Sequence, residues 1–133
     1  MRTALTVGIK GKRSMVVTHE DLASVMGSSS MGLDIFATPA MILLMEVTAV
    51  QSILPYCAEG EGTVGSLLQI EHVAPTLEGA HVTCESELVE IDGRRLVFRV
   101  TASDECGVIG AGTHERYLIT IQRFIDKAVN RKG

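Results

Sequence analysis

The chain has 133 residues and a formal net charge of −4, and 46% of its residues are hydrophobic while 21% are charged. A chain of this length and composition folds as one domain with a well-filled core, so we expect a single domain over residues 1–133 and exclude a disordered protein. The acidic balance and the scattered Lys and Arg argue against nucleic-acid binding, and the longest apolar run, Ala40–Met45, is far too short to span a membrane.

The cysteines and histidines indicate a reducing compartment and no metal site. Cys57, Cys84 and Cys106 are an odd number without a CxxC spacing, so we expect free thiols. The N-terminal residues lack the order of charged and apolar residues that a secretory signal requires. The four histidines are scattered and do not pair with the cysteines. We therefore expect a cytoplasmic protein that holds no metal ion and no resident cofactor.

The N-terminal segment predicts two short strands and a short helix. Its pattern favours strands at Ala4–Ile9 and Ser14–Val17, joined by a turn at Gly11–Arg13. Thr18 begins a capping-box-like pattern, which predicts a helix over Glu20–Met26.

A polar loop and a long apolar helix come next. The composition of Gly27–Asp34 predicts a mobile loop. Thr38 is a favourable N-cap and Pro39 is preorganised for the first helical turn, so we expect a helix to begin there. The helix extends to Leu54, ends at Pro55 and is apolar on every side.

The remainder of the chain alternates with period two, which predicts long strands joined by tight turns. Such strands form an antiparallel sheet, and the apolar helix needs a sheet to cover it. One helix cradled by a curved antiparallel sheet is the hotdog fold, of the α+β class. Because the helix has no polar side, we also expect a second subunit to cover part of it. In chain order, the expected elements are strands at Val64–His72, Ala80–Ile91, Arg94–Ser103 and Val108–Gln122, with a hairpin turn at Asp92-Gly93 and a final helix at Arg123–Arg131.

Glu46 is the single ionisable side chain of the predicted long helix. Its neighbours one turn away in either direction are apolar, so we expect its carboxylate to be desolvated. A desolvated carboxylate costs several kcal/mol unless it is paired, hydrogen-bonded or protonated. Two interpretations stay open: a salt bridge to an arginine on a neighbouring element, or a catalytic carboxylate.

His72 shares a strand face with Ile70, and we expect this face to turn toward the helix, with Gly65 on the opposite face. A lone histidine in such a place is more often a core residue, but the carboxylate of Glu46 in the facing helix favours a function. Thr38 adds a hydroxyl, although N-capping alone explains this residue. The hydroxyl, carboxylate and imidazole are the groups that acyl transfer or assisted hydrolysis requires.

The stretches FATPA, LMEVTAV, VEIDGRRLVFRV and IGAGTHERYLI, together with Gly62–Ala74, resemble the fluoroacetyl-CoA thioesterase family of hotdog proteins. The likeness extends from about residue 35 to the end, and the spacings of eight residues from Thr to Glu and 26 from Glu to His also match. The resemblance implies a catalytic set of Thr38, Glu46 and His72 that acts on an acyl-CoA thioester in a homodimer. It also implies that the backbone at Gly65 lies beside the thioester carbonyl, where a glycine permits close approach.

The lid segment departs from the family pattern. In the fluoroacetyl-selective member this segment is rich in phenylalanine and proline, whereas here it is Ser28–Gly32 and Phe36 is the only aromatic residue nearby. We expect Phe36 to contact the substrate, without an aromatic gate that recognises fluorine. His114 and Arg116 share one face of the last strand, and they either bind coenzyme A phosphates or the pantetheine arm or form a charge pair.

We therefore expect a homodimer that hydrolyses a short-chain acyl-CoA to the free acid and coenzyme A. Glu46 either activates water or attacks the carbonyl with help from Thr38, and His72 serves as general acid or base. The alternative is a non-catalytic hotdog protein that binds acyl-CoA or another small apolar ligand. A hotdog hydratase is less favoured, because the Asp and His pair of such enzymes is absent from Phe36–Pro39 at the helix start.

Overall fold

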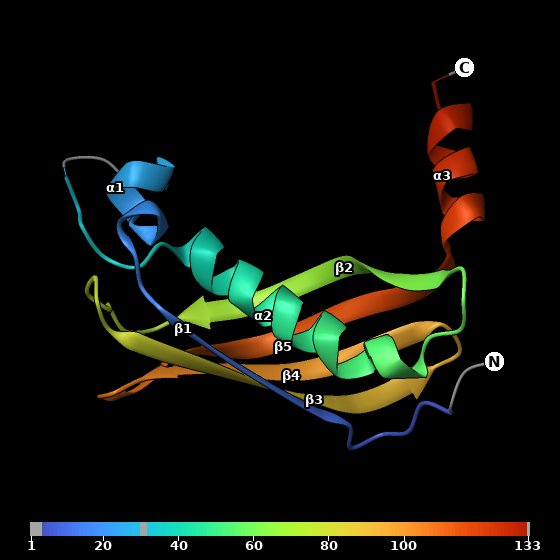
Figure 1. Cartoon of the computed structure of the whole chain (residues 1–133), viewed down its shortest axis with the longest axis horizontal. Coiled ribbons are helices and arrows are strands. Elements are labelled where there is room, and N and C mark those ends of the chain that lie inside the picture. Colours follow the sequence, from blue (N-terminus) through green and yellow to red (C-terminus); the bar gives the residue numbers. More distant parts are fainter. Residues whose placement is uncertain (1–3, 30–31, 133) are drawn as a thin grey trace.

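The computed structural model describes residues 4–29 and 32–132, which form an antiparallel sheet curved around one long helix (Figure 1). The sheet has five strands in the spatial order β1-β3-β4-β5-β2. This arrangement confirms the predicted α+β hotdog fold. The strands are β1 Lys10–Val16, β2 Glu61–His72, β3 His81–Asp92, β4 Arg95–Asp104 and β5 Gly107–Thr120. The helices are α1 Ala23–Met26, α2 Thr38–Ile53 and α3 Ile121–Asn130, with 3₁₀ turns at His19–Asp21 and Leu54–Tyr56.

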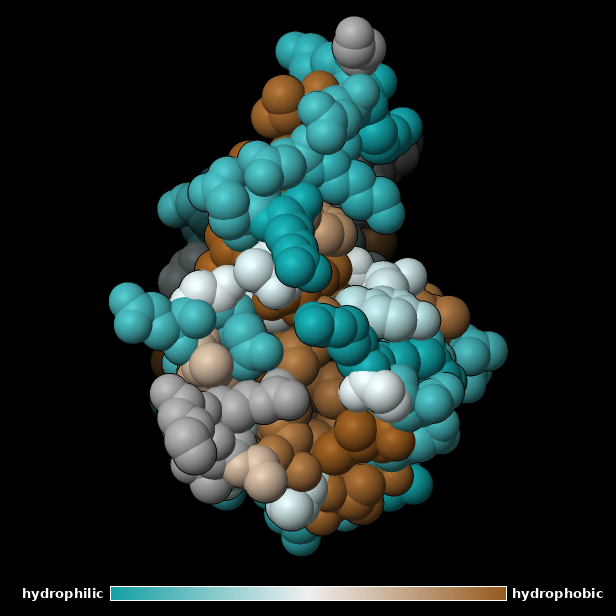
Figure 2. Space-filling model, turned by 90° about the vertical axis from the view of Figure 1, so that its right-hand side faces the viewer, coloured by the Kyte–Doolittle hydropathy of each residue, from teal (hydrophilic) through white to brown (hydrophobic). Residues whose placement is uncertain are grey.

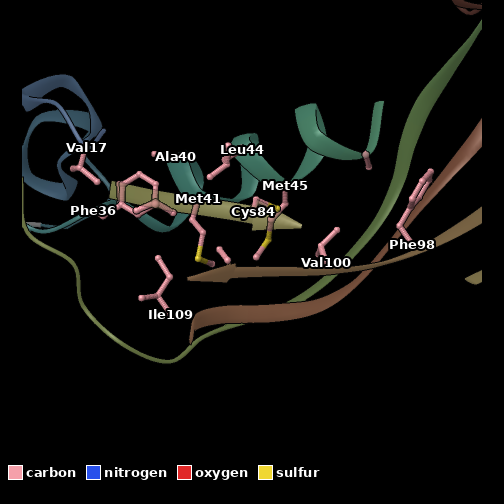
Figure 3. Close-up of a cluster of buried hydrophobic side chains, with 14 of the residues drawn as sticks. Val17, Phe36, Ala40, Met41, Leu44, Met45, Cys84, Phe98, Val100 and Ile109 are labelled. Atoms are coloured by element: carbon pink, nitrogen blue, oxygen red, sulfur yellow. The ribbon is translucent and has the colours of Figure 1, made fainter. Parts of the chain in front are cut away.

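The hydrophobic core lies between α2 and the sheet. Met41 and Met45 project from α2 toward the sheet, where Phe98 and Val100 of β4 are also fully buried (Figure 3). Phe36 extends this cluster at the N-terminal end of α2 and is 1% exposed. Burial of each such side chain contributes about 1.5–3 kcal/mol, so this layer holds the helix firmly on the sheet.

Within the part of the chain that the structure describes, the long helix is covered on one side only. Its buried residues face the sheet, whereas Leu43 is 59% exposed on the outer side and Leu54, just after the helix, is 47% exposed. By length and composition alone, Thr38–Tyr56 could span a membrane. The core helix of a globular protein meets the same criterion, and the burial of α2 against the sheet supports that interpretation.

The N-terminal strand differs from the prediction. Residues Lys10–Val16 form one strand, the predicted turn Gly11–Arg13 lies inside it, and no strand covers Ala4–Ile9. A Cβ atom at Gly11 would lie 2.8 Å from the Thr48 carbonyl oxygen of α2. The predicted turn is therefore wrong, because Gly11 allows β1 to approach the helix closely rather than reversing the chain.

Strand β2 contains a bulge that strict alternation did not predict. Its pairing with β5 slips by one residue between Gly65 and Leu67. Such a bulge reverses the alternation of the side chains that follow it. The expectation that Gly65 and His72 lie on opposite faces is wrong, because both face α2.

Other differences are small. The predicted helix Glu20–Met26 is divided into a 3₁₀ turn and the short α1. The predicted capping box is present, since the backbone N–H and the hydroxyl of Thr18 donate to Oδ2 of Asp21 at 2.8 and 2.9 Å. The hairpin between β3 and β4 turns one residue later than predicted, at Gly93-Arg94, where Gly93 has a φ of +60°.

Candidate active site

Thr38 and His72 form a hydrogen-bonded pair. Ala37 occupies the N-cap position of α2 and Thr38 is the first helical residue, so the predicted N-cap is wrong by one position. The Thr38 hydroxyl is therefore not used in capping and lies 2.8 Å from Nδ1 of His72, the last residue of β2. The pair forms because the start of α2 lies over the end of β2.

The other ring nitrogen of His72, Nε2, has an environment different from that of Nδ1. Nε2 is buried and makes no hydrogen bond among the described residues. Burial lowers the pKa of His72 below the usual 6.5, although the backbone of Ala74 offsets part of this effect. The imidazole is therefore neutral at pH 7, and its buried Nε2 is available to a hydrogen-bonding group that enters the site.

A pocket of about 340 Å³ opens beside this pair. We call it the acyl pocket; Thr38, His72 and Phe36 line it together with three residues of the loop Gly27–Asp34. The lining is largely apolar with a few convergent polar groups, which is typical of ligand sites, and its described residues include no lysine or arginine. Two residues of the predicted lid, Ser30 and Met31, lie outside the described part of the chain.

Glu46 lies in a second cluster, farther along α2. Its Oε2 is 3.2 Å from Nη1 of Arg116 and 4.0 Å from Nε2 of His114, both on β5. The Glu46 side chain is 35% exposed, whereas the side chain of Arg116 is 8% exposed and that of His114 is fully buried. The salt bridge that the sequence left open for Glu46 therefore has a partner, Arg116.

Arg116 is positioned by Thr63 of β2. Its Nε donates to the Thr63 hydroxyl at 2.9 Å, and its Nη2 donates to the Thr63 carbonyl oxygen at 3.0 Å. Burial lowers the pKa of Arg116 and the Glu46 carboxylate raises it, and the guanidinium keeps its charge at neutral pH. Thr63 was missed by the sequence analysis, because a threonine in a strand is ordinary and nothing in its spacing points to Arg116.

His114 completes this cluster. Its Nδ1 lies 2.9 Å from the Leu67 carbonyl oxygen, and its Nε2 lies 3.1 Å from Nη1 of Arg116. Burial lowers the pKa of His114, and the charge of Arg116 acts in the same direction. His114 and Arg116 thus point into the interior beside Glu46. This placement favours the charge pair that the sequence analysis left open for His114 and Arg116. It argues against the other role, a contact with coenzyme A phosphates.

Gly65 lies beside this cluster. A Cβ atom there would lie 2.6 Å from Oε2 of Glu46 and 3.3 Å from Nη1 of Arg116. Any larger residue would displace the carboxylate or the guanidinium. The glycine therefore lets Glu46 lie directly over β2, and it leaves the strand backbone exposed beside a carboxylate.

Within one chain, the two clusters are separate. Thr38 and Glu46 are eight residues apart on α2, which corresponds to about 12 Å along the helix axis. The structure thus joins Thr38 to His72 and Glu46 to Arg116, and it does not bring the three predicted catalytic residues together in a single chain.

Comparison with known proteins agrees with this fold. A protein-family model described as fluoroacetyl-CoA-specific thioesterase matches residues 17–122. The fluoroacetyl-CoA thioesterase of Streptantibioticus cattleyicolor is 43% identical over 91 residues, which are 68% of this chain and 66% of that relative. The matched segment thus spans just under two thirds of the relative's length.

Solved structures extend the similarity to the whole fold. A structure of the fluoroacetyl-CoA thioesterase is 35% identical with a TM-score of 0.89, covering 98% of this chain and 99% of that one. A variant crystallised with fluoroacetate and CoA is 35% identical with a TM-score of 0.85, covering 90% and 99%. The family model and these similarities together show that the chain belongs to the fluoroacetyl-CoA-specific thioesterase family of hotdog-fold thioester hydrolases.

Proposed function

We propose that the protein hydrolyses a short-chain acyl-CoA to the free acid and coenzyme A in the cytoplasm, without a resident cofactor. The observation that carries this proposal is the hydrogen bond of 2.8 Å between Thr38 and Nδ1 of His72 in the wall of the acyl pocket. A pocket of about 340 Å³ is at the small end of ligand sites and suits a short acyl group. The related protein crystallised with fluoroacetate and CoA supports this substrate class.

We assign to Thr38 and His72 the stabilisation of the carbonyl oxygen of the substrate. We assign the hydroxyl of Thr38 as the donor to Nδ1 across this distance of 2.8 Å, which keeps the proton of the neutral imidazole on Nε2. Nε2–H then donates to the thioester carbonyl and stabilises the negative charge that develops there. One positioned donor of this kind contributes about 10²–10³-fold to turnover.

We assign to Glu46 the role of general base for the attacking water. The carboxylate accepts a proton as the water oxygen bonds to the carbonyl carbon, and that proton passes to the leaving thiolate when the C–S bond breaks. Arg116 holds the carboxylate at 3.2 Å, and Gly65 leaves room beside it. General base catalysis contributes about 10²–10⁴-fold. In the covalent alternative, Glu46 attacks the carbonyl carbon itself from the same position.

A homodimer would bring the two clusters together. Among the described residues β2 pairs only with β5, so its other edge, twelve residues long, is unpaired. Two such edges pair antiparallel about a two-fold axis in a self-complementary interface. The His72 end of one β2 then lies beside the Glu61 end of the other, with the two Gly65 positions between. Each Thr38–His72 pair accordingly works with Glu46 of the second copy.

A non-catalytic protein that binds acyl-CoA is the second candidate, and one observation favours it. Glu46 is the counterion of Arg116, which is largely buried. If that is its whole role, Glu46→Gln should destabilise the fold by about 3 kcal/mol or more. If Glu46 is catalytic, the variant should stay folded, because Thr63 still accepts two hydrogen bonds from Arg116, and turnover should fall at least about a hundredfold.

One experiment separates the two candidates. The wild-type protein and Glu46→Gln are incubated with acetyl-, propionyl- and butyryl-CoA, and the release of free thiol is followed beside thermal unfolding. Steady release by the wild type and loss of turnover in a stable variant support hydrolysis. Tight binding of the acyl-CoAs without turnover supports the binding protein.

A further inference from the structure

The described residues of the acyl pocket provide no cation for the phosphates of coenzyme A. Its described lining residues include no lysine or arginine. Arg116, the predicted contact, is largely buried and pairs with Glu46. Phosphates are bound in proteins mainly by charge-assisted hydrogen bonds from Arg and Lys. The nucleotide end of the substrate therefore needs a site elsewhere in the assembly.

A second pocket, at the base of α3, contains positively charged side chains that could bind phosphates. It has a volume of about 230 Å³ and is lined by Arg94, Arg123 and Lys127, with no acidic residue among its described lining residues. The guanidinium of Arg94 is fixed by a hydrogen bond to the Leu118 carbonyl oxygen at 3.1 Å. Phe124 adds an aromatic surface on which a nucleobase can stack. We call this the basic pocket; its composition suits a phosphorylated nucleotide.

Helix α3 projects away from the sheet (Figure 1), and hydrophilic side chains cover much of its surface in Figure 2. It also carries an apolar stripe at helical spacing, in which Ile121, Ile125 and Val129 are 44%, 50% and 62% exposed. The segment from Ile121 to Lys132 contains four basic residues and one acidic residue. An exposed helix that is both basic and amphipathic is suited to contact another surface.

The two-fold pairing of β2 strands would place α3 of one copy beside the acyl pocket of the other. α3 begins directly after Thr120, which pairs with Glu61 at the start of β2. In an antiparallel dimer, the Glu61 end of one β2 lies beside the His72 end of the other. The basic pocket and the partner's acyl pocket are then two or three strand spacings apart, about 10–15 Å. The extended pantetheine arm of coenzyme A covers such a distance.

The surface near the acyl pocket complements α3 in hydrophobicity and in charge. Val25, Met26 and Leu33 are 44–46% exposed there and can meet the apolar stripe of α3. Glu20 and Asp34 in the same segment supply negative charge opposite a basic helix. The contact would hold the loop beside the acyl pocket against the second copy.

We propose that the basic pocket of one copy, formed by Arg94, Arg123 and Lys127, binds the phosphates and adenine of an acyl-CoA whose acyl group lies in the acyl pocket of the second copy. This inference rests on the proposed function and on the two-fold dimer. The site for the whole substrate is then complete only when two copies assemble.

Substrates with and without phosphates test this role. In Arg123→Gln/Lys127→Gln, the KM for acetyl-CoA should rise about tenfold or more while kcat stays within about twofold. Kinetics with acetyl-pantetheine, which lacks the phosphates and the adenine, should not change. The matched control is Lys12→Gln/Arg13→Gln on β1 at the opposite edge of the sheet, and it should alter neither substrate. An unchanged KM for acetyl-CoA, or equal losses with both substrates, overturns the proposal.

Mixed dimers test which copy supplies the charge. When a His72→Ala copy is paired with an Arg123→Gln/Lys127→Gln copy, the one active acyl pocket lies beside an intact α3, and the KM should be normal. When all three substitutions are in one copy and its partner is wild type, the active pocket lies beside the altered α3, and the KM should be raised. The reverse pattern would assign the basic pocket to the acyl pocket of its own chain and overturn the proposal.

Calorimetric binding of coenzyme A separates this inference from the proposed function. Hydrolysis that does not depend on the charges of α3 overturns the inference and leaves the function standing. Coenzyme A binding that weakens about tenfold in Arg123→Gln/Lys127→Gln, without hydrolysis of any acyl-CoA, supports the inference and overturns the function. Neither binding nor hydrolysis by the wild type overturns both.

Discussion

At the scale of single residues, the chemistry depends on neighbours that position the reactive groups. Thr38 holds one nitrogen of His72, and Arg116 holds the carboxylate of Glu46. Gly65 contributes by having no side chain, because a Cβ atom would overlap the carboxylate. Substitutions at Thr38 and Gly65 should therefore change turnover more than stability.

Gly65→Ala tests the need for space beside Glu46. The new methyl group would lie 2.6 Å from Oε2 of Glu46, so the carboxylate must move away from its position over β2. Thiol release from acetyl-CoA should fall about tenfold or more, with a loss of about 1 kcal/mol in stability. Gly62→Ala in the same strand is the control, since its methyl group would meet Ile121 at an ordinary 3.5 Å. Similar activity in both variants would contradict the account.

The pH dependence tests the neutral state of His72. Burial lowers its pKa below 6.5, so activity should be level above pH 6.5 and fall as the pH drops through the lowered pKa. Unfolded His72 binds its proton near pH 6.5 and the folded chain only at lower pH, so the free energy of unfolding should decrease as the pH falls through this window. His114 shifts in the same direction. Urea unfolding across this range should show a smaller pH dependence in His72→Gln than in the wild type, and an identical dependence would contradict the assignment.

At the scale of elements, the strongly periodic segments were predictable and the irregular ones were not. The apolar helix α2 and strands β3 to β5 follow from spacing, because burial imposes a period on each. The predicted strand Ser14–Val17 covers only the second half of β1, because the prediction places Gly11 in a turn, whereas Gly11 allows a close contact with α2. The bulge after Gly65 has no local sequence pattern, yet it turns Gly65 and His72 to the same face and so determines the site.

The loop Gly27–Asp34 should give the protein little selectivity between acetyl-CoA and fluoroacetyl-CoA. Its described residues in the acyl pocket are small or aliphatic, and Phe36, the nearby aromatic residue, is packed in the core at 1% exposure. We expect kcat/KM for acetyl-CoA to lie within about a hundredfold of the value for fluoroacetyl-CoA. A larger preference would require more than ~2.7 kcal/mol of discrimination from other residues and would contradict this view of the loop.

At the scale of the whole molecule, the outer side of α2 and the free edge of β2 both require a partner. Light scattering of the dilute protein should give about twice the chain mass of 14.3 kDa. Leu68→Glu, at a residue of β2 that is 44% exposed, should shift the protein toward monomer and reduce thiol release in parallel, because the site shared between two copies is lost. Val16→Glu, at a residue 46% exposed on β1 at the opposite edge of the sheet, is the control and should stay dimeric. A fully active monomer would contradict the proposal that two copies of the chain share each active site.

Subunit mixing tests the central claim most directly. Glu46→Gln and His72→Ala homodimers should each be inactive or nearly so, because every site lacks one group. After the two variants are unfolded together and refolded, mixed dimers should each contain one complete site, in which His72 comes from one chain and Glu46 from the other. Thiol release from acetyl-CoA should then recover to about a quarter of the wild-type rate, as random pairing of two chains predicts. No recovery in a sample that contains mixed dimers would contradict a site shared between two copies of this chain.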